Sequence, residues 1–174
     1  MKFSTRARYG LRMMVELARL LEHEHLVHLG RIARITGLSE NYLAQLAISL
    51  RNDGLLIGVS GQRGGYQLAR PASQIRVGDI IKALIGPISL TDCVTNPNVC
   101  MNSGACETRT VWAIVNHRVQ ETLDSMSLAD LIRRDWLSDM QQKHADLALL
   151  FPDRMVAALA EDASAGCPGK KDVR

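Results

Sequence analysis

The sequence predicts a mainly α-helical fold with a small β-hairpin wing, a winged helix-turn-helix followed by a long dimerisation helix. The 174-residue chain is 47% apolar but only 4% aromatic, and Ala, Leu, Ile and Val supply most of its apolar content, which suits helices. Apolar residues recur with a helical period along the first part of the chain. A glycine-rich stretch of alternating apolar residues follows, as is typical of a hairpin.

The first segment, "STRARYGLRMMVELARLLE", has the spacing of an amphipathic helix, and Ser4 or Thr5 can cap its start. Its expected buried face comprises Ala7, Leu11, Met14, Val15, Ala18 and Leu21. A second, shorter helix places Leu29, Ile32 and Ala33 inward. We expect Gly37 to end it, because glycine tolerates the left-handed conformation that closes a helix.

A third helix is predicted to start at the N-cap Ser39 and to end at Gly54. Its expected buried stripe is Leu43, Leu46 and Leu50. Two short helices joined by a tight turn form a helix-turn-helix, whose second helix can enter the major groove of DNA. The candidate base readers on its exposed side are Glu40, Asn41, Ala44 and Gln45. Tyr42 can bond a phosphate or pack inward, and both readings stay open.

The stretch "LLIGVSGQRGGYQLAR" changes to a period of two. Leu55, Ile57 and Val59 are expected on the buried face of one strand, and Tyr66 and Leu68 on that of the next. Glycines in "SGQRGG" supply the turn of a hairpin, which serves as the wing. Arg63 at its tip is a candidate contact to the electronegative minor groove.

Charge is unevenly spread along the chain. Residues 1–82 hold twelve Lys and Arg against six Asp and Glu, a balance of +6, whereas residues 83–174 hold nine against twelve, a balance of −3. This asymmetry favours a polyanionic partner such as double-stranded DNA, although a solvated surface gives the same count. Arg51 is a candidate DNA contact, and the candidate phosphate contacts are Lys2, Arg6, Arg8 and Arg34.

The second half of the chain predicts further helices. The first has Val77, Ile80, Ile81 and Leu84 inward and ends at Gly86-Pro87. A long helix then carries Val111, Ile114, Val115, Val119 and Leu123, while Trp112 and Ala113 widen its apolar surface. Such broad apolar coverage favours a two-fold partner and hence a homodimer. Ser127 caps a following helical segment, with Asp130 as its capping-box acid and with Leu128, Leu131, Ile132, Leu137 and Met140 as its apolar positions.

Four segments therefore organise the chain. Residues 1–86 form the predicted DNA-binding domain and residues 87–106 a cysteine-rich loop. Residues 107–150 hold the dimerisation helix and the helical segment after it, and residues 151–174 form an extension expected to be partly disordered.

Three cysteines, Cys93, Cys100 and Cys106, lie within the loop "DCVTNPNVCMNSGACETR". The chain shows no secretory signal and no apolar run long enough to span a bilayer, so we expect a cytoplasmic protein with no membrane partner. In a reducing compartment, clustered thiols bind metals or do redox work. An iron–sulfur site, a zinc site and a thiol switch are the alternatives. None of the five histidines has a catalytic context beside a cysteine, so no enzyme is expected.

Several stretches taken together resemble the Rrf-type winged-helix transcriptional regulators, the family whose cluster-binding branch includes IscR, NsrR and RirA. The stretches are "MKFSTRARYGLRMM", "LSENYLAQL", "LRNDGLL", "VSGQRGGYQLARP", "IRVGDIIKAL" and "SLADLI". The resemblance implies a cytoplasmic homodimer that binds a two-fold operator. It also implies a [2Fe–2S] or [4Fe–4S] cluster on Cys93, Cys100 and Cys106 that senses iron or iron–sulfur status, nitric oxide or oxidants.

The sequence departs from this family in four places. Arg109 stands where IscR has its ligand histidine, and Arg8 stands in the region where NsrR recruits an aspartate. The fourth ligand is therefore open, with Cys167 and His117 as weak candidates. On the DNA side, Ala44 replaces a glutamate of IscR that distinguishes promoters. Ser60 replaces an arginine of IscR at the wing, so the operator sequence does not carry over.

Overall fold

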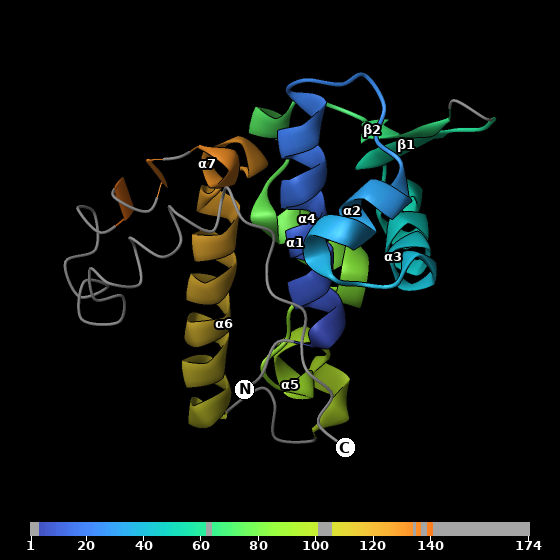
Figure 1. The fold of residues 1–174 in the computed structure, drawn as a ribbon. Helices are drawn as coiled ribbons and strands as arrows, with labels where there is room; N and C mark the ends of the chain where they lie inside the picture. Colours follow the sequence, from blue (N-terminus) through green and yellow to red (C-terminus); the bar gives the residue numbers. More distant parts are fainter. Residues whose placement is uncertain (1–3, 62–63, 101–105, 134, 137–138, 141–174) are drawn as a thin grey trace, which may run out of the picture.

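A computed structural model describes residues 4–61, 64–100, 106–133, 135–136 and 139–140. These residues form a mainly helical fold with one two-stranded antiparallel hairpin, as the sequence predicts. Figure 1 shows α1 and α4 in the middle, α6 on one side of them, and α2, α3 and the hairpin on the other. The elements are α1 (Thr5–Leu21), α2 (Leu29–Thr36), α3 (Glu40–Asn52), β1 (Leu56–Val59), β2 (Gly65–Leu68), η1 (Ala72–Gln74), α4 (Val77–Ile85), α5 (Asp92–Thr95), η2 (Pro97–Val99), α6 (Glu107–Ser125) and α7 (Leu128–Ile132).

The helix ends in the first part of the chain lie where the capping residues predict them. The Ser4 side chain accepts a hydrogen bond from the backbone N–H of Ala7 at 3.2 Å, and Ser39 accepts one from Tyr42 at 3.3 Å. Gly37 ends α2 with φ 70°, which is the left-handed conformation. These caps place α2 and α3 in succession around a short turn, which is the helix-turn-helix arrangement.

The core gathers one face of each of these helices. Leu43, Leu46 and Leu50 of α3 are fully buried, as predicted. They pack in one cluster with residues from α1, α2, α4 and α7, namely Met13, Met14, Leu17, Ile32, Ile80, Leu84 and Leu128. A smaller cluster of Ala7, Val77 and Ile81 joins α1 to α4 and has partly buried neighbours on α6 and α7. The core therefore fixes α4 against α1 and α3.

The contact between α1 and α4 depends on Gly10. A Cβ atom at this position would overlap Leu84 Cδ1 and would lie only 2.8 Å from Leu84 Cδ2, so the glycine makes room for a buried leucine. Arg6, one turn earlier on α1, donates from Nε to the carbonyl oxygen of Leu84 at 2.8 Å and from Nη2 to Ser49 Oγ at 2.6 Å. One arginine thus connects α1, the end of α4, and α3.

The hairpin has the opposite facing from the one that the sequence predicts. In the antiparallel register, Leu56 pairs with Leu68 and Val59 pairs with Gly65. Leu55 and Leu56 are both buried, but Ile57 and Val59 are 44% and 42% exposed. The prediction that Ile57 and Val59 share a buried face with Leu55 is therefore wrong. The reason is that Leu55 precedes the strand, so the alternation starts at Leu56 and turns Ile57 outward.

The return of the chain after α6 is held by backbone hydrogen bonds to the segment before α4. The Val77 N–H donates to the Met126 carbonyl oxygen at 2.9 Å, and the Leu128 N–H donates to that of Ile75 at 2.8 Å. These bonds seat α7 on the core, where Leu128 is fully buried. They also fix the C-terminal end of α6 beside the start of α4.

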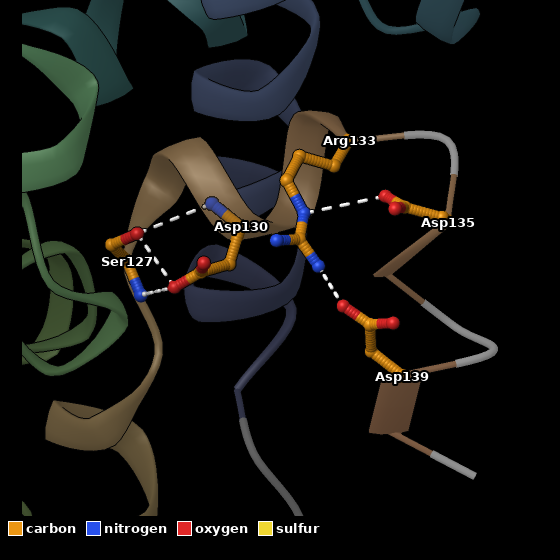
Figure 2. A network of polar contacts seen from close by, with 5 residues as sticks. All are labelled: Ser127, Asp130, Arg133, Asp135 and Asp139. Carbon is orange, nitrogen blue, oxygen red and sulfur yellow. Dashed lines mark hydrogen bonds and ion pairs between the residues drawn. The ribbon is translucent and has the colours of Figure 1, made fainter. Parts of the chain in front are cut away.

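α7 starts with a capping box, as predicted. Asp130 Oδ2 accepts hydrogen bonds from the Ser127 backbone N–H at 2.8 Å and from its hydroxyl at 2.6 Å, and the Asp130 N–H donates to Ser127 Oγ at 3.1 Å (Figure 2). The two hydrogen bonds from Ser127, first that of its hydroxyl and then that of its backbone, lower the pKa of Asp130. The carboxylate form is therefore the one that the fold selects.

The predicted helical segment from Ser127 through Met140 is shorter than expected. α7 ends at Ile132, and Arg133 turns extended with ψ 139°. The Arg133 guanidinium pairs with Asp135 at 3.3 Å and with Asp139 (Figure 2), so polar contacts replace the predicted apolar stripe after Ile132. Leu137 and the expected C-terminal extension, residues 151–174, lie outside the described residues. None of the described helices is long and apolar enough to cross a membrane.

We predict opposite effects for two glycine substitutions that both bring a Cβ into contact. Gly10→Ala gains about 1 kcal/mol of helix propensity but overpacks buried Leu84 by about 1–3 kcal/mol, so it should destabilise the fold by about 1–2 kcal/mol. Gly78→Ala meets the exposed Asp124 carboxylate, which can swing into solvent, and should change stability by less than about 0.5 kcal/mol. Urea denaturation measures both changes. If Gly10→Ala stays destabilising in a Leu84→Ala background, the contact is not the cause.

We also predict a pH-dependent contribution from the capping box. Asp130→Ala removes the acceptor of two Ser127 hydrogen bonds and should lower the free energy of unfolding by about 1–2 kcal/mol at pH 7. Because the native pKa of Asp130 is lowered, this contribution is complete above its ordinary value of 3.8 and is lost as the pH falls below it. Denaturation of both proteins between pH 7 and pH 3 should show the difference shrinking at the acid end. A difference that is independent of pH would contradict this account.

Candidate DNA-reading surface and cysteine segment

The outward side of α3 carries the predicted base readers. Asn41 and Gln45 are exposed, and Ala44 is half-buried. Glu40 is also exposed, but its carboxylate folds toward the first turn of α2, where Oε2 would lie 3.2 Å from a Cβ atom at Gly30. Asn41 and Gln45 therefore present free amide groups outward, whereas Glu40 lies against the neighbouring helix.

An open hollow of about 250 Å³ lies between α3 and the hairpin. It brings together three predicted DNA contacts, namely Glu40, Arg51 and Ser60. His28, the N-cap of α2, and Tyr66 of β2 also line it. The sequence did not point to these two residues, because only the fold places the start of α2 and the inner strand beside α3.

Tyr42 is half-buried, and its ring makes an edge-on contact with that of Tyr9, with centroids 6.2 Å apart. This geometry is typical of aromatic packing. It favours the packing interpretation that the sequence left open beside a phosphate contact.

The candidate phosphate contacts differ in their surroundings. Arg6 is half-buried and directs its Nε and Nη2 donors inside the molecule, so its role here is structural. Arg8 is exposed with its guanidinium 5.5 Å from the Tyr9 ring, and Arg34 is exposed with a bond from Nε to the Gly30 carbonyl oxygen at 3.4 Å. Lys2 and Arg63, which were predicted to contact DNA, lie outside the described residues.

The cysteine segment runs from the end of α4 to the start of α6. Cys93 lies in the short helix α5, Cys100 follows η2 and is exposed, and Cys106 is the N-cap of α6. None of these three thiols takes part in a disulfide. Figure 1 shows α5 beside the N-terminal end of α6, so Cys93 and Cys106 lie on elements that meet at that end.

Polar side chains on one face of α6 hold the start of this segment. Gln120 Nε2 donates to the Ile88 carbonyl oxygen at 3.4 Å, the Asn116 carbonyl accepts from the Leu90 N–H at 3.1 Å, and Arg109 Nε donates to the Cys93 carbonyl oxygen at 2.8 Å. As the segment advances from 88 to 93, its partners move toward the start of α6. The chain therefore runs antiparallel along the helix and delivers Cys93 to the helix end that begins with Cys106.

Arg109 stands where a ligand histidine was expected from the family resemblance. A guanidinium stays protonated and offers no lone pair to a metal. Its side chain instead fixes the backbone of Cys93 and lies one turn from Cys106. The sequence identified this position as a departure but did not show this contact, because it joins residues that lie 16 positions apart.

The environment of Cys106 favours its thiolate. The hydroxyl of Thr108 lies 3.1 Å from the Cys106 sulfur, and this contact is the main cause that lowers the pKa of the thiol. The backbone N–H of Arg109 and the charge of its guanidinium act in the same direction. Thiolates are the form that binds metals and attacks electrophiles, so Cys106 is prepared for either chemistry.

The donor chemistry of three free thiols fits a soft metal or an iron–sulfur cluster. Among the described residues, no three His, Cys, Asp or Glu side chains come close enough together to hold a metal ion. His117, a weak candidate for a fourth ligand, is exposed on α6 and pairs with Glu121 at 3.3 Å. Cys167, the other candidate, lies outside the described residues.

The opposite face of α6 is apolar and exposed. Asn116 is the one residue of this helix that is buried. The apolar residues between 41% and 58% exposed on α6 are Val111, Trp112, Ile114 and Val115. The predicted inward stripe is therefore only half-buried at Val119 and Leu123 and open to solvent at its other positions. An exposed patch of this kind on a helix marks an interaction site.

Comparison with known proteins gives a consistent family. A family model described as "Rrf2: Iron-dependent Transcriptional regulator" matches residues 3–134. The sequence is 37% identical over 133 residues to protein rrf2 of Nitratidesulfovibrio vulgaris, covering 76% of this chain and 88% of that protein. It is 41% identical over 132 residues to the HTH-type transcriptional regulator CymR of Bacillus subtilis, covering 75% of this chain and 89% of the relative.

Solved structures agree with the sequence comparison. The structure of B. subtilis CymR, named as a global cysteine regulator, superposes with a TM-score of 0.62 at 39% identity and covers 76% of this chain and 96% of its own. The structure of T. potens IscR superposes with a TM-score of 0.60 at 37% identity and covers 83% and 91%. These relatives are transcriptional regulators and not enzymes, as expected from the sequence.

We predict that Cys106 reacts faster with iodoacetamide at pH 7 than Cys100, because its pKa is lowered and that of an exposed thiol limits its thiolate fraction. Thr108→Val removes the hydroxyl that is the main cause of this shift and should slow Cys106 alkylation severalfold at pH 7 but not at pH 10. Thr108→Ser, which keeps the hydroxyl, is the matched control. Peptide mass spectrometry on the metal-free protein gives the rates. Equal rates in all three proteins would refute the role of Thr108.

Proposed function

The chain belongs to the Rrf2 family of transcriptional regulators, and from this premise we propose that it is a cytoplasmic, homodimeric DNA-binding regulator controlled by an iron–sulfur cluster. The observation that carries the cluster part is the hydrogen bond from Arg109 to the Cys93 carbonyl oxygen. It holds the segment bearing Cys93 at the helix end where Cys106 is the N-cap. Iron–sulfur status, nitric oxide or an oxidant would be the signal.

The DNA-binding part of the proposal rests on α3 and the hairpin. The proposed contacts from the described residues are Glu40, Asn41, Ala44, Gln45, Arg51 and Ser60. Asn41 and Gln45 have amide groups that can pair with adenine in the major groove. Arg51 and Ser60 line the hollow beside the hairpin and suit phosphate contacts.

The homodimer part rests on the exposed face of α6. A two-fold dimer buries the same patch of both copies, so one apolar helix face can cover its own copy. α6 contacts α4 and α5 with the face that holds Asn116, which leaves the apolar face free for a partner. Two copies joined in this way would present two α3 helices to the two halves of an operator.

The cluster would be held by Cys93, Cys100 and Cys106. A bound cluster supplies a redox-active, oxidant-sensitive centre whose sulfur and thiolate ligands carry negative charge. The chain contributes the positive end of the 19-residue helix α6 and the charge of Arg109, both of which favour thiolates at Cys106. Arg109, Asn116 and Gln120 keep the segment on α6, so a change at the cysteines bears directly on the proposed dimer helix.

A thiol switch is the second candidate, favoured by the thiolate environment of Cys106 and the exposure of Cys100. In this alternative, two thiols give two electrons and two protons to a peroxide, forming a disulfide and water. The fold, the dimer and the DNA contacts are the same, and the cysteines act without iron.

Purification without oxygen distinguishes the two candidates. We expect a brown protein that contains iron and sulfide, absorbs visible light, and binds promoter DNA differently after chelation of the iron. Cys93→Ala or Cys106→Ala should abolish iron retention, since each removes a thiolate ligand. Cys167→Ala is the matched control and should retain iron.

A colourless protein that takes up no iron and sulfide on anaerobic reconstitution would refute the cluster. If the same protein forms a peroxide-dependent disulfide that changes DNA binding, the thiol switch replaces the cluster. Failure of both the reduced and the oxidised protein to bind any duplex DNA would refute the proposed regulator itself.

A further inference from the structure

The reading helix carries an exposed isoleucine that the proposed function does not explain. Ile48 of α3 is 50% exposed, and among the described residues it is the single large hydrophobic side chain of this helix that is open to solvent. Removing an isoleucine side chain from water is worth about 1.5–3 kcal/mol, so an uncovered one has affinity for an apolar partner. The chemistry of its neighbours indicates what that partner is.

Ile48 lies in line with the amides that are proposed to read bases. Asn41, Gln45 and Ile48 are spaced i, i+4 and i+7 and therefore share one face of the helix. This face is opposite the buried stripe of Leu43, Leu46, Ala47 and Leu50. At 1.5 Å rise per residue, Ile48 lies about 10 Å from Asn41 along the helix axis, a distance of roughly three base steps in DNA.

Resting on the proposed DNA-binding function, we propose that Ile48 contacts the C5-methyl group of a thymine and thereby selects the operator. The major groove presents one apolar group, and it is this methyl group. An aliphatic side chain in line with two adenine-reading amides therefore has one matching feature in the groove. The thymine should lie roughly three base pairs from the base that Asn41 faces.

The position of Ile48 is fixed by its neighbour. Ser49 accepts the hydrogen bond from Arg6 Nη2 at 2.6 Å, and Leu50 is fully buried. This turn of α3 is consequently anchored to α1 and to the core. A side chain on an anchored turn can discriminate a single methyl group, because misplacing it requires the whole helix to shift.

A protein partner fits Ile48 less well than DNA does. The residues around it on the outward face are polar, namely Asn41, Gln45 and Asn52, so the apolar area is one side chain wide. The broad apolar face on α6 lies on the other side of α1 and α4 (Figure 1), so the two do not form one patch. An isolated apolar group within a polar stripe matches a groove of polar base edges with a single methyl group.

The test uses the full chain, purified without oxygen, and duplexes selected from a random-sequence library. In the selected duplex, each thymine is replaced in turn by deoxyuridine, which lacks only the methyl group. The wild type should lose about fourfold in affinity at one thymine per half-site, as expected for one buried methyl group. Ile48→Ala should bind the selected duplex about five- to twentyfold more weakly and lose less than twofold on the same replacement.

Two further variants control for folding and for general apolar effects. Ile48→Val keeps a branched side chain and should stay sensitive to the deoxyuridine. Ile85→Ala shortens another exposed isoleucine, the last residue of α4, and should bind as the wild type does. Deoxyuridine effects that are equal in the wild type and Ile48→Ala would overturn the contact while leaving DNA binding intact. Retention of no duplex by any of the proteins would overturn the proposed function and this contact together.

Discussion

The close approach of α1 and α4 at Gly10 is the constraint on which the rest of the structure depends. Because no side chain stands at Gly10, Leu84 enters the core and the end of α4 reaches Arg6. α4 then contacts α3 on one side and α6 on the other. The reading helix and the long helix are therefore both positioned relative to the same short element. Widening the space between α1 and α4 would change both positions at once.

Arg6 shows how the cysteine segment and the reading helix are connected. Its guanidinium bonds to Leu84, two residues before the segment at 87–106 begins, and to Ser49 on α3. The other end of that segment is bound along α6 by Arg109, Asn116 and Gln120. A rearrangement of the segment would act on packed contacts at both of its ends. Communication between two sites requires two arrangements of such contacts with different affinities for the ligand.

The elements that the sequence predicted correctly are those set by local chemistry. Ser39 and Gly37 act within a few residues of their own position, and the leucine stripe of α3 reflects the geometry of one helix. The facing of β1 was predicted wrongly because a strand and the residue before it can both be buried, and only the register with β2 decides the phase. The internal role of Arg6 was missed for a similar reason, since its partners lie 43 and 78 positions away.

Two kinds of exposed apolar surface follow from this architecture, and they call for different partners. The apolar face of α6 comprises neighbouring large side chains, and covering it requires another apolar surface of similar size. Ile48 stands alone within a polar stripe, and covering it requires a polar surface with one apolar group. A second copy of the chain meets the first requirement, and the major groove of DNA meets the second. A regulator that binds DNA as a dimer needs both surfaces, and this fold places them on opposite sides of α1 and α4 (Figure 1).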